Sequence, residues 1–77
     1  MITRKELIMN EEKIKELEKA VSKARFVWSQ KAGAMHDLIE DRLPADYKEI
    51  PQYAADTFEA CQEWDKLNQQ LLIAKRQ

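Results

Sequence analysis

The sequence is poor in the residues that interrupt helices. Its 77 residues include two prolines, Pro44 and Pro51, and one glycine, Gly33. Glycine and proline are the strongest breakers of regular structure, so we expect a helical chain with one main interruption, located near the two prolines. Gly33 falls inside a helical pattern, where it costs about 1 kcal/mol relative to alanine. We therefore expect close packing of Gly33 against a large side chain.

Cysteine and long apolar runs are also scarce. Cys61 is the only cysteine, so no internal disulfide can form, which fits a reduced cytosolic protein better than a secreted one. Without a basic neighbour, Cys61 is expected to be a small filler of the core. No stretch is apolar enough for a signal peptide or a membrane span, and we expect a cytoplasmic protein. Nucleophile-elbow, phosphate-binding and dinucleotide motifs are missing as well, and we expect no enzymatic activity.

Two amphipathic patterns flank the interruption. In both, apolar residues recur at intervals of three and four, the heptad-like spacing of packed helices. Pro44 disfavours the helical conformation of Leu43, and residues 46–49 resemble a capping box that starts the second helix. The sequence therefore predicts an all-α fold, an antiparallel two-helix hairpin. The predicted elements are a helix over about residues 4–42, a turn over about 43–49 and a helix over about 50–75, in a single domain of residues 1–77.

A hairpin of this size leaves apolar surface uncovered. At 1.5 Å per residue the first helix is about 58 Å long and the second about 39 Å, so the N-terminal turns extend beyond their partner. Phe58 and Leu72 fall outside the stripe of the second helix, which widens the apolar surface beyond a two-helix seam. We therefore expect a homo-oligomer, either a dimeric four-helix bundle or a higher oligomer. The residues expected at the interface are Leu7, Ile14, Leu17, Val21, Trp28, Trp64 and Leu71.

Charge is unevenly distributed, although the net charge is −1. Residues 1–31 carry eight basic and five acidic side chains, residues 32–65 carry two and nine, and residues 66–77 carry three and none. In a hairpin, the acidic segment forms the bend and both basic segments lie at the other end. This pattern is typical of solvated helix faces, and it also suits an acidic tip that meets a basic partner or a cation. Glutamates interleave with the basic residues of the first helix, which weakens the case for nucleic-acid binding.

The bend region also holds the only histidine. His36 and Glu40 are four residues apart, so both side chains can project from one helix face towards one ion, and Asp37 and Asp41 repeat this spacing. Nitrogen and oxygen ligands together suit a divalent transition metal. With one histidine per chain, such a site needs completion across subunits; the alternative is a histidine hydrogen-bonded to a neighbouring carboxylate. The fold-back is expected to bring three further residues close to this group, namely Tyr53, Asp56 and Thr57.

The sequence around the bend carries a distinctive pattern, formed by Met35-His36-Asp37-Leu38-Ile39-Glu40-Asp41-Arg42-Leu43-Pro44, Tyr47, Ile50-Pro51, Ala54 and Thr57-Phe58-Glu59-Ala60. Over about residues 20–68, the chain resembles the Rop-like family of small proteins encoded in nitrogen-fixation gene clusters. It departs from the family pattern by an extra residue near Asp41-Arg42 and by Tyr47, where tryptophan is common.

The resemblance implies a self-associating helical hairpin without established catalytic activity. It also implies a role alongside nitrogenase maturation or function, with a nitrogenase-related protein as partner. Some members are described as metalloproteins, which implies His36, Asp37 and Glu40 as metal ligands here. The leading prediction is therefore a non-enzymatic accessory protein of nitrogen fixation. The alternatives are a metal-binding protein whose site at the acidic bend is completed across subunits, and a nucleic-acid-binding bundle of the Rop type.

Overall fold

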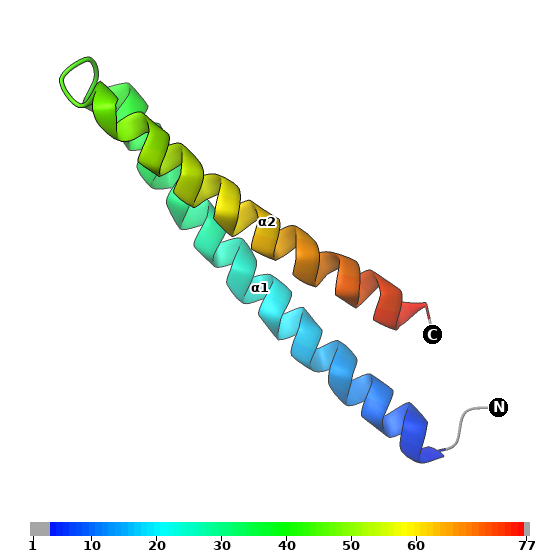
Figure 1. Cartoon of the computed structure of the whole chain (residues 1–77). Coiled ribbons are helices and arrows are strands. Elements are labelled where there is room, and N and C mark those ends of the chain that lie inside the picture. The colour runs from blue at the N-terminus through cyan, green and yellow to red at the C-terminus, as the bar shows by residue number, and fades with distance from the viewer. Residues whose placement is uncertain (1–3, 77) are drawn as a thin grey trace.

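The chain folds into two antiparallel helices joined by a tight bend (Figure 1). The computed structural model describes the backbone of residues 4–76 and the side chains of residues 4 and 10–76. Helix α1 spans Arg4–Asp41, a short 3-10 helix η1 spans Tyr47–Glu49, and helix α2 spans Ile50–Lys75. The hairpin is a rod of 62 × 14 × 13 Å, with the bend at one end and both chain ends at the other. The predicted all-α helical hairpin is confirmed.

Backbone hydrogen bonds carry the chain through the bend. The Asp46 amide donates to the Arg42 carbonyl at 2.9 Å, and the Glu49 amide donates to the Asp46 carbonyl at 3.0 Å. Pro51 lies in the first turn of α2, where its missing N–H would have no helical partner in any case. The predicted capping box over residues 46–49 is wrong, because the Asp46 side chain makes no capping hydrogen bond. Its carboxylate instead accepts a hydrogen bond from the Arg42 side chain.

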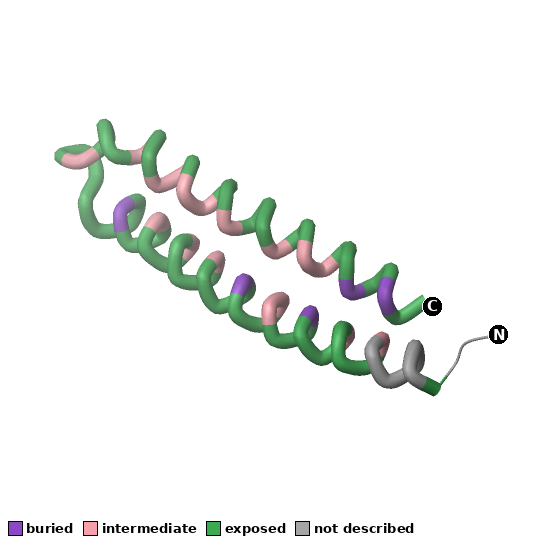
Figure 2. The backbone as a smooth tube through the Cα atoms, turned by 60° about the horizontal axis from the view of Figure 1, so that its bottom comes forward, coloured by how far each residue is buried: buried purple, intermediate pink, exposed green. Residues whose placement is uncertain are grey.

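A narrow apolar line between α1 and α2 forms the core (Figure 2). Leu38 is the most deeply buried side chain of the described residues, with 0% of its surface exposed. At the other end of the rod, Leu17, Leu71 and Ala74 form a buried cluster with Ile14 and Val21 packed against it. The buried apolar residues of the described chain are Leu17, Ala24, Leu38, Leu71 and Ala74. So small a core confirms how little of its apolar surface one hairpin covers.

Two packing predictions for single residues are wrong. Gly33 has no atom within 4 Å of the position that a Cβ would take, so it packs against no large side chain. Cys61 is exposed and fills no space in the core. The inner line of α1 passes through Trp28 and Met35, and that of α2 passes through Trp64. At about 100° per residue, Gly33 and Cys61 are both rotated away from these lines.

The open end of the hairpin has unequal helices. Lys75 Nζ, in the last turn of α2, lies 4.0 Å from Glu18 Oε1, which fixes where α2 ends beside α1. Residues 4–13 of α1 therefore extend beyond the end of α2 (Figure 1). At 1.5 Å per residue this extension is about 15 Å long. The predicted overhang is present, and no part of the same described chain covers it.

Candidate interaction surfaces and the bend

The side chain of Arg42 forms hydrogen bonds with three residues around the bend. Its Nε donates to Asp46 Oδ2 at 2.8 Å, its Nη2 donates to Glu49 Oε2 at 2.7 Å, and its Nη1 donates to the Tyr53 hydroxyl at 3.1 Å. The guanidinium carbon also lies 6.0 Å from the centre of the Tyr53 ring. One side chain just after α1 thus contacts the turn before η1, η1 itself and the first turn of α2. Arg42 is therefore a positioning residue of the bend.

The same contacts favour the charged form of Arg42. Its pKa is raised above the ordinary arginine value, first by the hydrogen bond to Asp46 and then by the one to Tyr53; the charges of Glu49 and Asp46 add smaller contributions. Partial desolvation acts in the opposite direction and is outweighed. The role of Arg42 was not predicted from the sequence. The available signal was an arginine followed by acids four and seven residues later across a proline bend.

His36 lies on an exposed part of α1, with 71% of its side chain accessible. Its Nε2 lies 3.3 Å from Glu40 Oε2, and its Nδ1 lies 3.8 Å from Asp37 Oδ1. The three predicted metal ligands are therefore neighbours on one helix. Even so, residues 4 and 10–76 contain no group of three or more His, Cys, Asp or Glu side chains that could hold a metal ion. The arrangement resembles a histidine beside carboxylates more closely than a formed metal centre.

The three residues expected to approach His36 from α2 make other contacts. The Tyr53 hydroxyl accepts a hydrogen bond from Arg42. Thr57 Oγ1 donates to the Tyr53 carbonyl at 2.9 Å, within α2. Asp56 Oδ1 accepts from Gln52 Nε2 at 2.8 Å, and Asp56 lines a groove beside Val27. None of these hydrogen bonds involves His36, and the predicted grouping of His36 with these three residues stays a prediction.

The predicted oligomer interface largely serves the hairpin itself. Leu17 and Leu71 are buried between α1 and α2, with Ile14 and Val21 packed against them. Trp28 and Trp64 are partly buried along the same inner line. The side chain of Leu7 lies outside the described residues. The half-buried members remain open to a second chain, but the largest exposed apolar side chains lie elsewhere.

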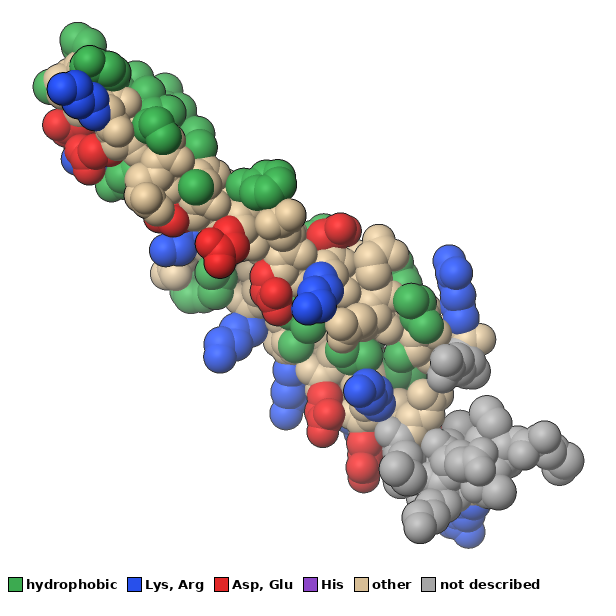
Figure 3. Space-filling view, viewed as in Figure 1, with side chains coloured by type: hydrophobic (Ala, Val, Ile, Leu, Met, Phe, Trp, Pro, Cys, Tyr) green, Lys and Arg blue, Asp and Glu red, His purple; other side chains and the backbone are tan. Residues whose placement is uncertain are grey.

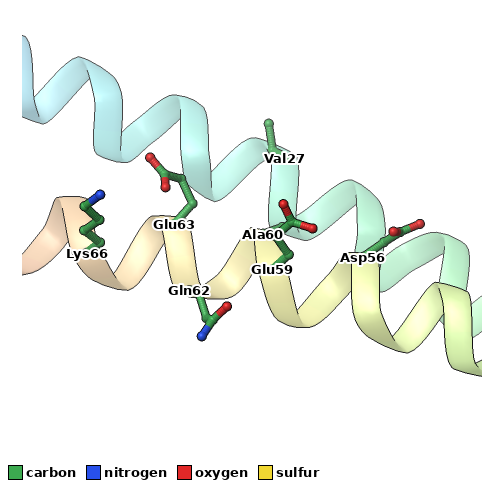
Figure 4. A pocket seen from close by; sticks show the side chains of 7 residues that line it. All are labelled: Val27, Asp56, Glu59, Ala60, Gln62, Glu63 and Lys66. Atoms are coloured by element: carbon green, nitrogen blue, oxygen red, sulfur yellow. The ribbon is translucent and has the colours of Figure 1, made fainter.

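One flank of the hairpin is a groove bordered by carboxylates, which we call the acidic flank (Figure 4). Its acidic residues are Asp56, Glu59 and Glu63 of α2, and Val27 of α1 lies beside them. Towards the open end the groove continues over small residues, with a cavity volume of about 350 Å³. The residues lining that part are Ala20, Lys23, Ala24, Val27, Ala60, Glu63 and Leu67.

The opposite flank is apolar, and we define the apolar flank as Ile39 of α1 with Phe58, Cys61 and Leu72 of α2. At about 100° per residue, Cys61, Leu72 and Phe58 are rotated by about 60°, 80° and 120° from Trp64, in the sense opposite to the acidic flank. Ile39 is rotated in the same sense on α1, and in antiparallel helices equal senses of rotation lead to the same flank. Figure 3 shows hydrophobic side chains along one edge near the bend and charged ones along the other.

The apolar flank is well exposed. Phe58 is 65% exposed, Ile39 48% and Leu72 44%, and Cys61 is exposed as well. Between residues 50 and 64, all the charged side chains of α2 belong to the acidic flank. Over that span, the apolar flank of α2 therefore carries no charge.

Fold and surfaces together define a small helical hairpin whose exposed flanks suit helix–helix association. Residues 12–76 match the family described as Rop-like, and the chain belongs to that family. No curated protein and no solved structure matches the chain. The Rop-like family is not a family of enzymes. Among the described residues, neither helix is long and apolar enough to cross a membrane.

Proposed function

We propose that the chain is a non-enzymatic interaction protein that pairs with a second copy of itself to form a four-helix bundle. The observation that carries this proposal is the exposed surface. The chain exposes 6382 Å² at a mass of 9.1 kDa. A compact monomer of that mass exposes about 4,900 Å², so roughly 1,500 Å² is in excess. A complex of standard size buries about 800 Å² on each partner, which this excess readily supplies.

Two further features support pairing. Residues 4–13 of α1 extend beyond α2 and have no helix of the same chain beside them. The Rop-like family is also known for dimeric bundles. A second chain beside the overhang would complete the helix packing that one hairpin leaves unfinished.

Native mass spectrometry of protein prepared without an affinity tag tests the proposal. We expect a dimer with twice the 9.1 kDa mass of one chain. The same spectrum reports any bound metal through the added mass. A folded monomer at every concentration would contradict self-association, and a higher oligomer would correct its stoichiometry.

The proposed biological setting is nitrogen fixation, in the cytoplasm and beside a nitrogenase-related partner. Support for this setting comes from the amino-acid sequence around the bend, from Met35 to Ala60, which resembles that of family members encoded in nitrogen-fixation gene clusters. A deletion strain should grow more slowly on dinitrogen and normally on ammonium. Equal growth on both nitrogen sources would contradict the proposed role.

The nucleic-acid alternative has less support. Basic side chains of α1 such as Lys15 and Lys19 alternate with Glu16 and Glu18, so they form no continuous positive face. Gel shifts with RNA at low salt test this alternative. A shift that weakens steeply with added salt would revive it.

A further inference from the structure

We propose that the second copy docks on the apolar flank and leaves the acidic flank open to solvent. This inference rests on the proposed function, because it names the surface through which the proposed dimer forms. The exposed residues of the apolar flank, the distribution of charge and the available area each support the choice of this surface.

Exposed apolar side chains are grouped on this flank. Ile39, Phe58 and Leu72 are each 44% or more exposed, and Cys61 lies between the latter two along α2. Phe26 and Ile73 are also exposed, but at about 100° per residue they are on the outer sides of α1 and α2, away from both flanks. Single exposed apolar residues are ordinary on soluble proteins, whereas a contiguous group marks an interaction site. On this flank, Ile39, Phe58 and Cys61 lie in the half of the rod near the bend, and Leu72 lies about 16 Å beyond Cys61 along α2.

The distribution of charge favours the apolar flank over the acidic flank for contact with a second copy of the chain. A symmetric dimer places the same patch of both chains together, so charges near the two-fold axis meet like charges. On the acidic flank between residues 50 and 64, this pairing would bring Asp56, Glu59 and Glu63 of one chain towards the same three carboxylates of the other, while Lys66 lines the groove further along α2. Like charges placed opposite each other strongly disfavour association. The apolar flank has no charge on α2 between residues 50 and 64 and one carboxylate, Asp65, between Cys61 and Leu72, so like charges oppose pairing less on this flank.

The area of the flank is also sufficient. From Ile50 to Leu72 it extends for about 33 Å at 1.5 Å per residue, which is about half of the rod. A phenylalanine can bury 150–250 Å² of surface, so Phe58 alone would supply a substantial part of the roughly 800 Å² that a standard interface takes from each partner. Phe58 is therefore expected to be the main anchor of the interface.

The test compares two identical substitutions at equally exposed positions. Phe58→Asp places a carboxylate on the apolar flank, and Phe26→Asp places one on the outer side of α1, where the wild-type residue is 63% exposed. Sedimentation equilibrium should show a dimer dissociation constant raised about thirtyfold or more by Phe58→Asp, as for an interface hot spot. Phe26→Asp should change the constant by no more than about threefold. Circular dichroism at 222 nm checks that both variants remain helical.

The native thiol provides a second readout that does not depend on either variant. Cys61 lies on the apolar flank, so its reaction with a maleimide should slow at least tenfold as protein concentration rises through the dimer dissociation constant. A matched control is Gln30→Cys in a Cys61→Ser background, because the exposed Gln30 is rotated by about 160° from Trp28 and lies on the outer side of α1. The control thiol should react at a rate independent of concentration.

The outcomes separate the two proposals. A wild type that stays monomeric at all concentrations overturns self-association, and the docking surface with it. A wild-type dimer that Phe58→Asp leaves intact, with Cys61 still reactive, overturns only the surface. That second result would show the apolar flank open in the dimer and free for a different protein.

Discussion

The bend end and the open end of the hairpin are held together by different interactions. At the bend, one arginine makes three side-chain hydrogen bonds across the turn, and Leu38 is fully buried just before it. At the open end, Leu17 packs with Leu71 and Ala74, and the nearest ion pair spans 4.0 Å between half-exposed side chains. Beyond this pair, α1 continues without α2.

This difference shows which part of the hairpin depends on a partner. The bend is closed by contacts within one chain, so its geometry needs no second copy. The open end has fewer polar contacts and a helix that extends past its neighbour. A second chain would therefore stabilise the open end more than the bend.

Loss of the Leu38 side chain should have the largest effect on stability. Leu38→Ala leaves a cavity at a fully buried position and should lower the free energy of unfolding by about 3 kcal/mol. Leu17 is 7% exposed and is the comparison site at the open end. Leu17→Ala should lower the free energy of unfolding by about 2 kcal/mol, because the surroundings of Leu17 can relax. Urea unfolding at one fixed protein concentration measures both. A larger loss at Leu17 would reverse the proposed order of the two ends.

Loss of the Arg42 side chain at the bend should have the next largest effect on stability. Arg42→Gln keeps the polarity but loses the forked pairing with Asp46 and Glu49, so the melting temperature should fall. Lys19→Gln, at an exposed site on the outer side of α1, is the control and should leave the melting temperature nearly unchanged. Differential scanning calorimetry compares the two variants. Equal melting temperatures would show that the contacts at the bend add no stability.

The raised pKa of Arg42 also defines a pH window. A base with a raised pKa contributes its stability below its unfolded-state pKa and loses it only as the pH rises through the folded-state pKa. For arginine both values lie above about pH 12. The melting-temperature difference between wild type and Arg42→Gln should therefore stay constant from about pH 6 to pH 10. A difference that shrinks towards pH 10 would contradict this assignment.

The ion pair of the open end should contribute very little. Lys75 and Glu18 are each about half exposed and lie 4.0 Å apart. Pairs of this kind are worth less than about 0.5 kcal/mol because water and salt screen them. Lys75→Ala should therefore change the urea midpoint by an amount close to experimental error. A clear loss of stability would mean that the open end is held by charge.

Metal binding at the bend is the smallest expected effect. One chain offers His36 with Asp37 and Glu40, all highly exposed, so a metal ion would need further ligands from another subunit. Under that proposal, calorimetric titration of Ni²⁺, Fe²⁺ or Zn²⁺ should show weak heats that His36→Ala abolishes. Identical heats for the two proteins would contradict a metal site at His36.

Most of the fold could be predicted from the sequence. Few breakers, two prolines close together and apolar residues at intervals of three and four define two helices and one bend. In the antiparallel hairpin, the Lys75–Glu18 pair places Trp28 and Trp64 at about the same height along the rod. Local patterns of this kind depend only on helix geometry.

What the sequence did not predict depends on contacts across the bend or on the rotation of a residue around its helix axis. Arg42 contacts residues four, seven and eleven positions later, which helix periodicity alone does not reveal. Gly33 and Cys61 were misplaced because their positions relative to the inner line depend on accumulated rotation along each helix. By contrast, Phe58 and Leu72 stood outside the predicted stripe, and this signal led to the apolar flank.

The most direct test of the central claim is the melting temperature as a function of protein concentration, followed at 222 nm from about 2 to 200 µM. If a second copy covers the surface that one hairpin leaves exposed, the melting temperature should rise by several degrees over this range, because unfolding includes dissociation. A fully helical chain that melts at one temperature throughout, and sediments as a monomer, would contradict the account.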